Sequence, residues 1–492
     1  MNPLFYLDGY KVSHREQYPK GTEYVYSNFT PRKARPEAAQ DGMVFFGLQA
    51  ALIKFIDELE KHIEDITLCG EDPPTHIAGE YQAVMQQYLG DFDYPQHIED
   101  FVVYYMENGE LPIKVKALPE GSLVPFGVPA MTMVNTNPNF FWFVNYLETY
   151  LSSQLWKPCT SATTARRFRK LFDDYAEATG ADKSFVDFQG HDFSFRGMSN
   201  VEDAMTSGAA HLLFFKGSDT VPAFGFIDDY YPGTDFPLAS VPATEHSVMC
   251  AGGEDDERAT FERLITEVYP KGIVSIVADT WDFFGVLTDI APSLKDEIMA
   301  RDGKVVFRPD SGVPNLIVNG NPDSEDEDER KGALQILWEQ FGGTTNEKGF
   351  KVLDPHVGLI YGDGIDIVMA EKILQGMADN GFASSNIVLG LGSFTYQYAT
   401  RDTYGTVCKA THVTINGEDK PIFKQPKTGA WKTSHKGLLR VDLVDGKFQV
   451  TQDVTREEEE QGELVTVYDK GLVEDKIQGF ESIREKALGT LD

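Results

Sequence analysis

Seven times between about residues 185 and 395, a short apolar run ends abruptly in a polar turn, usually rich in glycine. Several of the stretches between these runs carry apolar residues at helical spacing, as in 257–269 and 367–380. Short buried strands that alternate with helices predict parallel βα units. The expected strands are the apolar runs at 184–188, 211–215, 237–243, 272–278, 304–307, 356–362 and 386–390.

This number of runs in about 210 residues favours an incomplete (β/α) barrel over a flat sheet. The two flanks have a different pattern, with a helix expected at 48–65 and antiparallel strands around a hairpin turn at 444–447. We therefore predict an α/β fold with two domains. Residues 161–395 would form a barrel-like catalytic domain, and residues 1–160 with 396–492 a mixed α/β sandwich domain built from both chain ends.

Composition narrows the classes of function. The 492-residue chain has a net charge of −33, which disfavours nucleic acid and anionic lipid as partners. It has neither a long apolar stretch that would span a membrane nor a recognisable signal peptide. Its four cysteines lie far apart, which fits a reducing cytoplasm better than a disulfide or zinc framework. We expect the acidic stretches 321–330 and 456–461 to be solvated loops or turns.

Polar side chains follow nearly every expected strand at its carboxyl end. In a (β/α) barrel these ends open on one face, where active sites lie. A single aspartate at such a position is more often a helix cap than a catalytic group, but the set as a whole favours a functional site. Its members are Arg196, Asp219, His246, Asp279, Arg308, Asp310 and Asp363.

Two glycine-rich loops, 361–366 and 389–394, follow consecutive strands near the end of the expected barrel. Loops in this position often bind phosphate, because glycine lets backbone N–H groups approach the anion closely. Arg308 can form a bidentate clamp on phosphate or pyrophosphate, and Asp310 can orient Arg308 or accept from a sugar hydroxyl. Asp363 can bind a ribose diol, while Asp279 can do likewise or hold Mg²⁺.

Further cations follow the second glycine loop and stand out in an acidic protein: Arg401, Lys409, Lys424, Lys432 and Lys436. The simplest interpretation of these cations is that they keep the protein soluble, but they could also bind pyrophosphate. Phe193 beside Arg196 suits a flat heteroaromatic ring near a phosphate. Asp219 would accept hydrogen bonds from an amide and repel a carboxylate ligand. The implied substrate is a phosphorylated sugar bearing pyrophosphate.

These residues occur in motifs that resemble the nicotinamide phosphoribosyltransferase family, the type II phosphoribosyltransferases. The matching stretches lie in the family's order over most of the chain: 8–19, 191–197, 215–221, 241–247, 277–282, 308–312, 361–366 and 400–402. The resemblance implies that nicotinamide and 5-phosphoribosyl 1-pyrophosphate give nicotinamide mononucleotide and pyrophosphate, a salvage step toward NAD. It also implies a homodimer with active sites shared across the interface.

By the same resemblance, Phe193 and the partner's Tyr10 would enclose the nicotinamide ring, and Asp219 would take its carboxamide. The nucleotide or phosphoribosyl group would be held by Arg196, Asp279, Arg308, Asp310, Gly362, Asp363 and the loop around Gly392. The pyrophosphate would face Arg32, Arg401, Lys409, Lys424 and Lys432. Mg²⁺ would stabilise the departing pyrophosphate, and His246 would be phosphorylated by ATP as co-substrate.

One departure from the resemblance is at Ser393 and Phe394, which stand where the family's vertebrate members have glycine and would narrow the phosphate site. The alternatives are nicotinate phosphoribosyltransferase, which Asp219 disfavours, and a non-catalytic metabolite-binding homologue. Quinolinate is a weaker candidate, because its two carboxylates call for more cations at the ring pocket.

Overall fold

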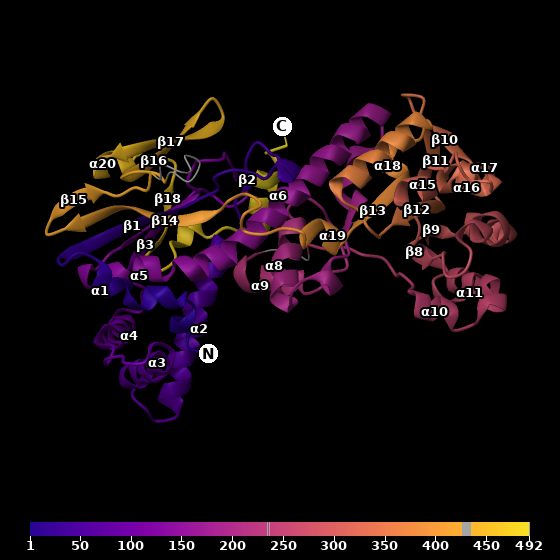
Figure 1. The fold of residues 1–492 in the computed structure, drawn as a ribbon. Helices are drawn as coiled ribbons and strands as arrows, with labels where there is room; N and C mark the ends of the chain where they lie inside the picture. The colour runs from indigo at the N-terminus through magenta and orange to yellow at the C-terminus, as the bar shows by residue number, and fades with distance from the viewer. Residues whose placement is uncertain (234, 236, 426–433, 492) are drawn as a thin grey trace.

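The computed structural model describes residues 1–233, 235, 237–425 and 434–491. Two six-stranded sheets organise the chain, and Figure 1 shows them at opposite ends of an elongated molecule. The first, in the order β15-β14-β1-β5-β3-β18, is antiparallel throughout. Its strands come from both ends of the chain: β1 (Thr22–Thr30), β3 (Ile113–Ala117), β5 (Met131–Asn135), β14 (Val407–Ile415), β15 (Glu418–Pro421) and β18 (Val465–Asp469).

Helices α2 (Leu48–Leu68), α3 (Pro73–Leu89), α4 (Gln96–Asn108) and α5 (Phe141–Tyr146) lie on the antiparallel half. The predicted hairpin is present as β16 (Leu438–Val444) and β17 (Lys447–Val454). Its turn residues Asp445 and Gly446 have φ of 50° and 75°, as the tight turn of a twisted hairpin requires. The joint contribution of the two chain ends to one sheet agrees with the predicted mixed α/β architecture.

The second sheet is parallel throughout, in the order β7-β6-β13-β12-β9-β8. The strands are β6 (Gly190–Asp192), β7 (Gly217–Ser218), β8 (Lys271–Val277), β9 (Asp302–Arg308), β12 (Val357–Tyr361) and β13 (Ile387–Leu391). A short extended segment, residues 239–244, joins the two edge strands: it bridges to β7 at Ala239 and to β8 at Ala243. The sheet is therefore curled, and the fold is the α/β class with a barrel-like parallel sheet that the sequence predicts.

Three of the expected strands are not strands in the structure. The run at 237–243 makes only the two isolated bridges at Ala239 and Ala243. Residues 184–188 lie in η5 (Lys183–Phe185) and α7 (Val186–Gln189), and 211–215 in the end of α8 (Val201–His211) and the turn after it. The strands β6 and β7 begin a few residues later. Leu212 to Phe215 are fully buried, and a buried helix end cannot be distinguished from a buried strand by periodicity alone.

The acidic stretches also differ from the prediction. Residues 321–330 include α16 (Glu327–Lys331), whose first turn is capped by the Asp326 carboxylate. Residues 456–461 begin with α20 (Arg456–Glu459), and Glu459 is buried rather than solvated. Lys116 lies 2.9 Å from the Glu459 carboxylate, which explains how this charge is tolerated in the interior.

The 32-residue helix α6 (Glu148–Thr179) runs from the antiparallel half to the barrel (Figure 1). It contacts β2 (Met43–Val44) and β14 on one side, and α8 and α18 (Ile367–Asp379) on the other. The helix ends at Gly180, whose φ of 65° lets the N–H of Ala181 bond back to the Ala176 carbonyl. The predicted boundary between residues 160 and 161 falls inside α6, and the division into two domains stays a prediction.

The packing of α6 against the barrel can be tested at Phe172, which is fully buried between the rings of Phe168 and Phe215. Phe172→Ala should lower the free energy of unfolding by about 3–5 kcal/mol, because it removes a large apolar side chain and leaves a cavity. Chemical denaturation would measure this loss. Phe423→Ala, at a half-exposed phenylalanine, is the matched control and should cost less than about 1 kcal/mol. Equal losses of the free energy of unfolding in the two variants would contradict the burial of Phe172 between these rings.

Candidate active site

A cavity of about 570 Å³ lies at the carboxyl ends of the parallel strands. Loops that follow β6, β7, β9, β12 and β13 all contribute to its wall, as the alignment of parallel strands requires. The cavity brings together eight of the residues predicted from the sequence: Phe193, Arg196, Asp219, Arg308, Asp310, Gly362, Asp363 and Gly392. The prediction that these residues lie together on one face of the barrel is therefore confirmed for these eight.

Asp219 lies one residue past β7, with hydrogen-bond partners on both neighbouring segments. His191 Nε2 is 2.9 Å from Asp219 Oδ1, and the Ser240 hydroxyl donates to the same oxygen at 2.5 Å. Burial acts to raise the pKa of Asp219. The bonds from His191 and Ser240, with the charge of Arg308, outweigh it and hold this pKa below the usual range. Asp219 is therefore an ionised acceptor at neutral pH.

A second, mostly apolar cavity of about 430 Å³ adjoins the first and extends into the barrel. The two cavities share Phe193, Asp219, Ala243 and Arg308 in their walls. An aromatic ring and a fixed carboxylate thus meet where an apolar space joins a polar one. This junction suits a flat ligand that has an apolar ring and one polar substituent.

Arg308 ends β9 and is nearly buried. Its Nη2 donates to the Thr244 carbonyl at 2.5 Å, and its Nε lies 3.6 Å from Asp310 Oδ2. Burial raises the pKa of Asp310, the Arg308 charge lowers it, and the nearby carboxylates of Asp279 and Asp363 raise it further. Arg308 is thereby oriented by groups on both sides, which prepares it to clamp an anion.

His246 and Asp279 form a pair at the next strand end. His246 begins α10 (His246–Cys250) with a half-exposed side chain, and its Nε2 is 3.2 Å from Asp279 Oδ1. The other oxygen of the buried Asp279 carboxylate accepts from the Asp310 N–H at 3.0 Å and from the Ser311 hydroxyl. Asp279 therefore orients an accessible imidazole and also fixes the loop that follows Arg308.

Several predicted residues lie elsewhere. Tyr10, in η2 (Gly9–Ser13), is 61% exposed and does not line the barrel cavity. Its neighbours hold it to the start of α6: Lys11 pairs with Glu148 at 2.6 Å, and Asp8 bonds Thr149. Tyr10 and Phe193 of one chain therefore belong to different parts of the molecule.

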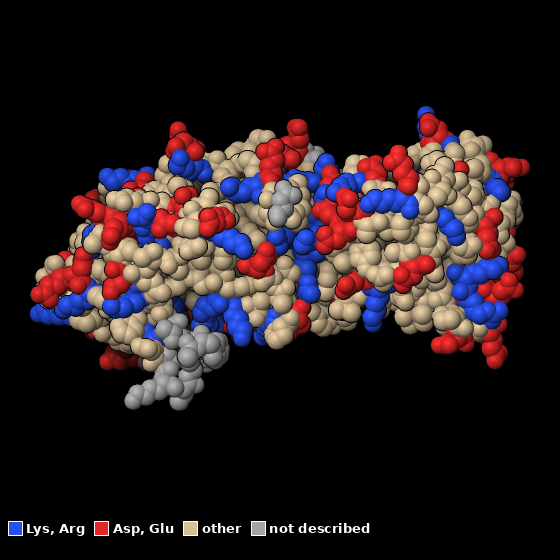
Figure 2. Space-filling view, turned by 90° about the horizontal axis from the view of Figure 1, so that it is seen from above, with Lys and Arg blue, Asp and Glu red and all other residues tan. Residues whose placement is uncertain are grey.

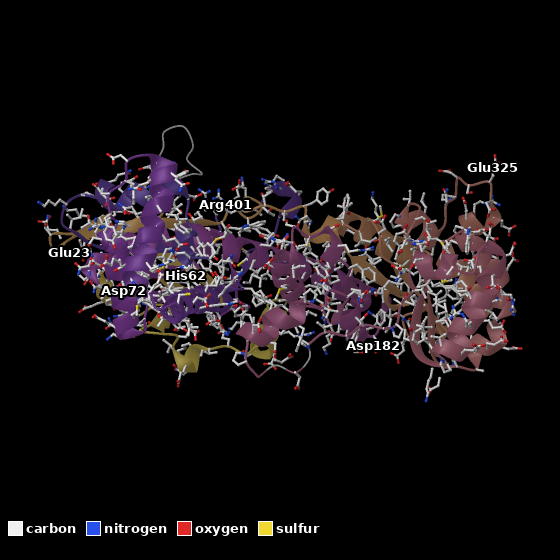
Figure 3. The ribbon with its side chains drawn as sticks, turned by 90° about the horizontal axis from the view of Figure 1, so that it is seen from below. Glu23, His62, Asp72, Asp182, Glu325 and Arg401 are labelled. Carbon is white, nitrogen blue, oxygen red and sulfur yellow. The ribbon has the colours of Figure 1, made fainter. Side chains whose placement is uncertain are left out.

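Four of the five predicted pyrophosphate cations are among the described residues, and they lie on the antiparallel half, where Figure 3 labels Arg401. Arg32 Nε donates to the Gly405 carbonyl, and the pKa of Arg32 is lowered by burial and by the charge of Arg401. Lys409 is in β14, and Lys424 follows β15. Lys432 lies outside the described residues. None of the four described cations lines the barrel cavity.

Charges of both signs are spread over the surface of both halves. On the face seen in Figure 2, many Lys and Arg side chains gather toward the middle of the molecule, while Asp and Glu extend over both ends. Figure 3 places Glu325, from the acidic stretch 321–330, at the far end of the barrel half. No group of three or more His, Cys, Asp or Glu in the described part of the chain is arranged to hold a metal ion.

The sequence prediction missed His191, Ser240 and Thr244, which hold Asp219 and Arg308. His191 and Thr244 stand in motifs used for the family resemblance, and Ser240 lies within an apolar run. Thr244 directly follows an expected strand and His191 closely follows one, which could have identified these two, whereas Ser240 lies inside an expected strand and has no such signal. The structure places Ser393 and Phe394 in the cavity wall. Gly197 is required there, because a Cβ on it would lie 2.2 Å from that of Ser393.

The part of the chain that the structure describes has no helix long and apolar enough to cross a membrane. Residues 188–472, more than half of the chain, match the model of the nicotinate phosphoribosyltransferase (NAPRTase) family. Residues 2–66 match the model of the nicotinamide phosphoribosyltransferase N-terminal domain.

Among curated proteins, the nicotinamide phosphoribosyltransferase of Acinetobacter baylyi is 48% identical over 96% of this chain and 94% of its own. Those of Mycoplasma pneumoniae and Xanthomonas campestris are 36% and 32% identical, over 88% and 96% of this chain and 94% and 95% of their own.

Two solved structures share the fold: human nicotinic acid phosphoribosyltransferase (TM-score 0.56, 16% identity) and a nicotinate-nucleotide pyrophosphorylase from Pyrococcus furiosus (TM-score 0.58, 14% identity). Each match covers 98% of this chain, with 93% of the human chain and 94% of the archaeal one. The chain therefore belongs to the nicotinate phosphoribosyltransferase family of pentosyltransferases, in the group that carries the nicotinamide phosphoribosyltransferase N-terminal domain.

Proposed function

We propose that this enzyme transfers the phosphoribosyl group of 5-phosphoribosyl 1-pyrophosphate to nicotinamide, giving nicotinamide mononucleotide and pyrophosphate in NAD salvage. The observation that carries the choice of substrate is the ionised Asp219 at the junction of the polar and apolar cavities. A carboxylate there accepts hydrogen bonds from a carboxamide NH₂. The carboxylate of nicotinate would meet a like charge in a partly buried site, which costs affinity.

The rest of the cavity suits the remainder of the reaction. Phe193 offers a face for the pyridine ring, and Arg196 and Arg308 supply positive charge for phosphate. Asp310 and Asp363 would accept from ribose hydroxyls, and the backbone at Gly362 and Gly392 allows a phosphate to approach. The ring nitrogen attacks the anomeric carbon, and the bond to pyrophosphate breaks. No general base is needed, because the attacking nitrogen carries no proton.

The departing pyrophosphate needs more positive charge than one chain's cavity provides. Mg²⁺ usually binds through phosphate oxygens, waters and one or two carboxylates, and Asp279, Asp310 and Asp363 line the same face. When bound, Mg²⁺ would neutralise charge on the leaving group. The donor set fits a metal brought in with the substrate better than an all-protein site.

We further propose a homodimer with shared sites. Tyr10 is exposed and fixed to the start of α6, away from Phe193 of its own chain. Arg32, Arg401, Lys409 and Lys424 likewise lie on the antiparallel half. A second copy that places its antiparallel half against the barrel mouth would bring both the missing aromatic face and the missing cations. We also expect the enzyme to act in the cytoplasm, which stays a prediction.

His246 would be phosphorylated by ATP: a ring nitrogen attacks the γ-phosphorus, ADP leaves, and phosphohistidine forms. Its half-exposed imidazole can reach a substrate. The Asp279 carboxylate beside Nε2 fixes the ring and favours a proton on that nitrogen, which leaves the opposite nitrogen as the nucleophile. Hydrolysis of this phosphate would then couple ATP to turnover.

Asp219→Asn should reduce kcat/KM for nicotinamide by about 10- to 100-fold, because the charge-assisted hydrogen bond from the amide is lost. The same change should raise the ratio of nicotinate to nicotinamide turnover, since the repelling charge is gone. Product formation from each base, with saturating phosphoribosyl pyrophosphate and Mg²⁺, measures both effects. Asp228→Asn, at an exposed aspartate of α9 (Ala223–Tyr230), is the control. Unchanged selectivity in Asp219→Asn would exclude the assigned role.

Incubation with γ-labelled ATP should transfer label to the intact enzyme in a bond that acid breaks and base does not. His246→Asn should take up no label, because the acceptor nitrogen is gone. His76→Asn removes a partly exposed histidine far from the barrel cavity and should label like the unchanged enzyme. Labelling of His246→Asn to the normal extent would place the phosphate elsewhere.

Shared sites predict complementation between two defective chains. Tyr10→Ala and Arg308→Ala homodimers should each be nearly inactive. Mixed dimers should have one site with both defects and one intact site, so random mixing should restore roughly a quarter of the full activity. Activity after co-expression, with the dimer fraction checked by sedimentation, tests this. No recovery in verified mixed dimers would show that each site is built by one chain.

A further inference from the structure

Lys157, in the first third of α6, is a buried cation that the proposed mechanism does not use. The residue is 7% exposed. Its Nζ donates to the Tyr396 carbonyl at 2.7 Å and to Gln397 Oε1 at 3.1 Å, and lies 3.5 Å from Asp203 Oδ1. The ammonium group therefore contacts two segments that are almost 200 residues apart in the sequence.

These two segments are active-site loops. Tyr396 ends the short helix α19 (Ser393–Tyr396) and Gln397 follows it, both within the connection after β13 that carries Gly392. Asp203 is in the first turn of α8 and closes the loop after β6, which carries Phe193 and Arg196. Lys157 itself does not line the barrel cavity. It lines a neighbouring hollow of about 460 Å³, on the other side of the two loops.

Further bonds connect the same two loops around this cation. The Gln397 amide donates to the Ser199 hydroxyl at 2.6 Å, and the Asp203 carboxylate accepts from the Ser199 N–H at 3.0 Å. Gly197 packs directly on Ser393. Lys157 is the one member of this network that comes from α6, and its removal would leave the Gln397 oxygen and the Asp203 carboxylate without their cation.

A lysine at this buried position does not favour the stability of the folded protein over an apolar side chain. Burial lowers its pKa below the usual value, and Asp203 restores only part of the loss. Buried ion pairs are often matched or exceeded in stability by apolar side chains of similar volume. The ammonium group instead contributes orientation, because it holds three hydrogen-bond acceptors from two loops around a single position.

We propose that Lys157 is a positioning residue, whose ammonium group holds the loop that carries Phe193 and Arg196 against the loop that carries Gly392. The ring-binding and phosphate-binding parts of the cavity are thereby kept at one separation, so that the base and the anomeric carbon meet in a reactive geometry. The kinetic consequences rest on the proposed transfer to nicotinamide. The structural consequence, a pair of loops ordered by Lys157, does not.

The test compares Lys157→Met, which keeps the length of the side chain without its charge, with Lys157→Arg, which keeps the charge. Lys157→Met should lower kcat/KM for nicotinamide by about 10- to 100-fold, as small misplacements in a reactive site do. Its midpoint of thermal unfolding should stay close to that of the unchanged enzyme. Lys157→Arg should recover part of the loss. Lys54→Met, a lysine of α2 that lines the same hollow, should leave the kinetics unchanged.

Amide hydrogen exchange supplies the second readout. Residues 193–200 and 392–399 should exchange faster in Lys157→Met than in Lys54→Met, with the rest of the barrel unchanged. Asp203→Asn combined with Lys157→Met should add little to the single changes, because both act on the same pair.

Normal kinetics and normal loop exchange in Lys157→Met would overturn the proposal. So would a loss of activity that merely follows a loss of folded protein and is not relieved in Lys157→Arg. An unchanged enzyme that turns over no pyridine base would remove the proposed function. The exchange measurement would then still decide whether Lys157 orders the two loops.

Discussion

The parallel pairing of β6, β13, β12 and β9 is the constraint on which the rest of the site depends. Parallel strands place their carboxyl ends at one edge, so residues far apart in the sequence meet there without any direct attraction between them. Phe193 follows β6, Arg308 ends β9, and Gly362 and Gly392 follow β12 and β13. Most residues of β6, β12 and β13 are buried, and in β9 Val305 and Phe307 are, so the core holds this edge while the loops beyond it carry the polar groups.

Electrostatics explains why each of the few groups that face the substrate is held by several polar contacts. In a protein of net charge −33, an anionic substrate is bound only where positive charge is concentrated and held. Arg308 is fixed by Thr244 and Asp310, and Asp279 fixes both His246 and the loop after Arg308. Each of these groups thus has a partner that orients it. Asp279 and Asp310 were predicted to touch the substrate themselves, whereas Thr244 was not among the predicted groups.

The sequence was sufficient to predict the α/β class, the barrel and eight residues of its cavity, because strand ends have a clear signal: an apolar run that stops at a polar turn. It misplaced β6 and β7, which have only two or three residues and whose buried neighbours lie in helices. It also misread Glu459, since a run of glutamates gives no sign that one of them is paired inside the protein. Orienting partners such as Ser240 were missed because they depend on which segments lie side by side in the folded barrel.

The position of α6 connects these observations. The first turn of this helix holds the segment that carries Tyr10, through Glu148 and Thr149, and Lys157, about two and a half turns further on, holds both cavity loops. In a dimer with shared sites, Tyr10 would contribute to the partner's site and the two loops to the chain's own site. Both would therefore be attached to the same helix, α6. A shift of this part of α6 would move both attachments, so the two sites of such a dimer would be coupled. This follows from the closeness of the two attachment points on one helix, and it gives the buried Lys157 a reason to be charged.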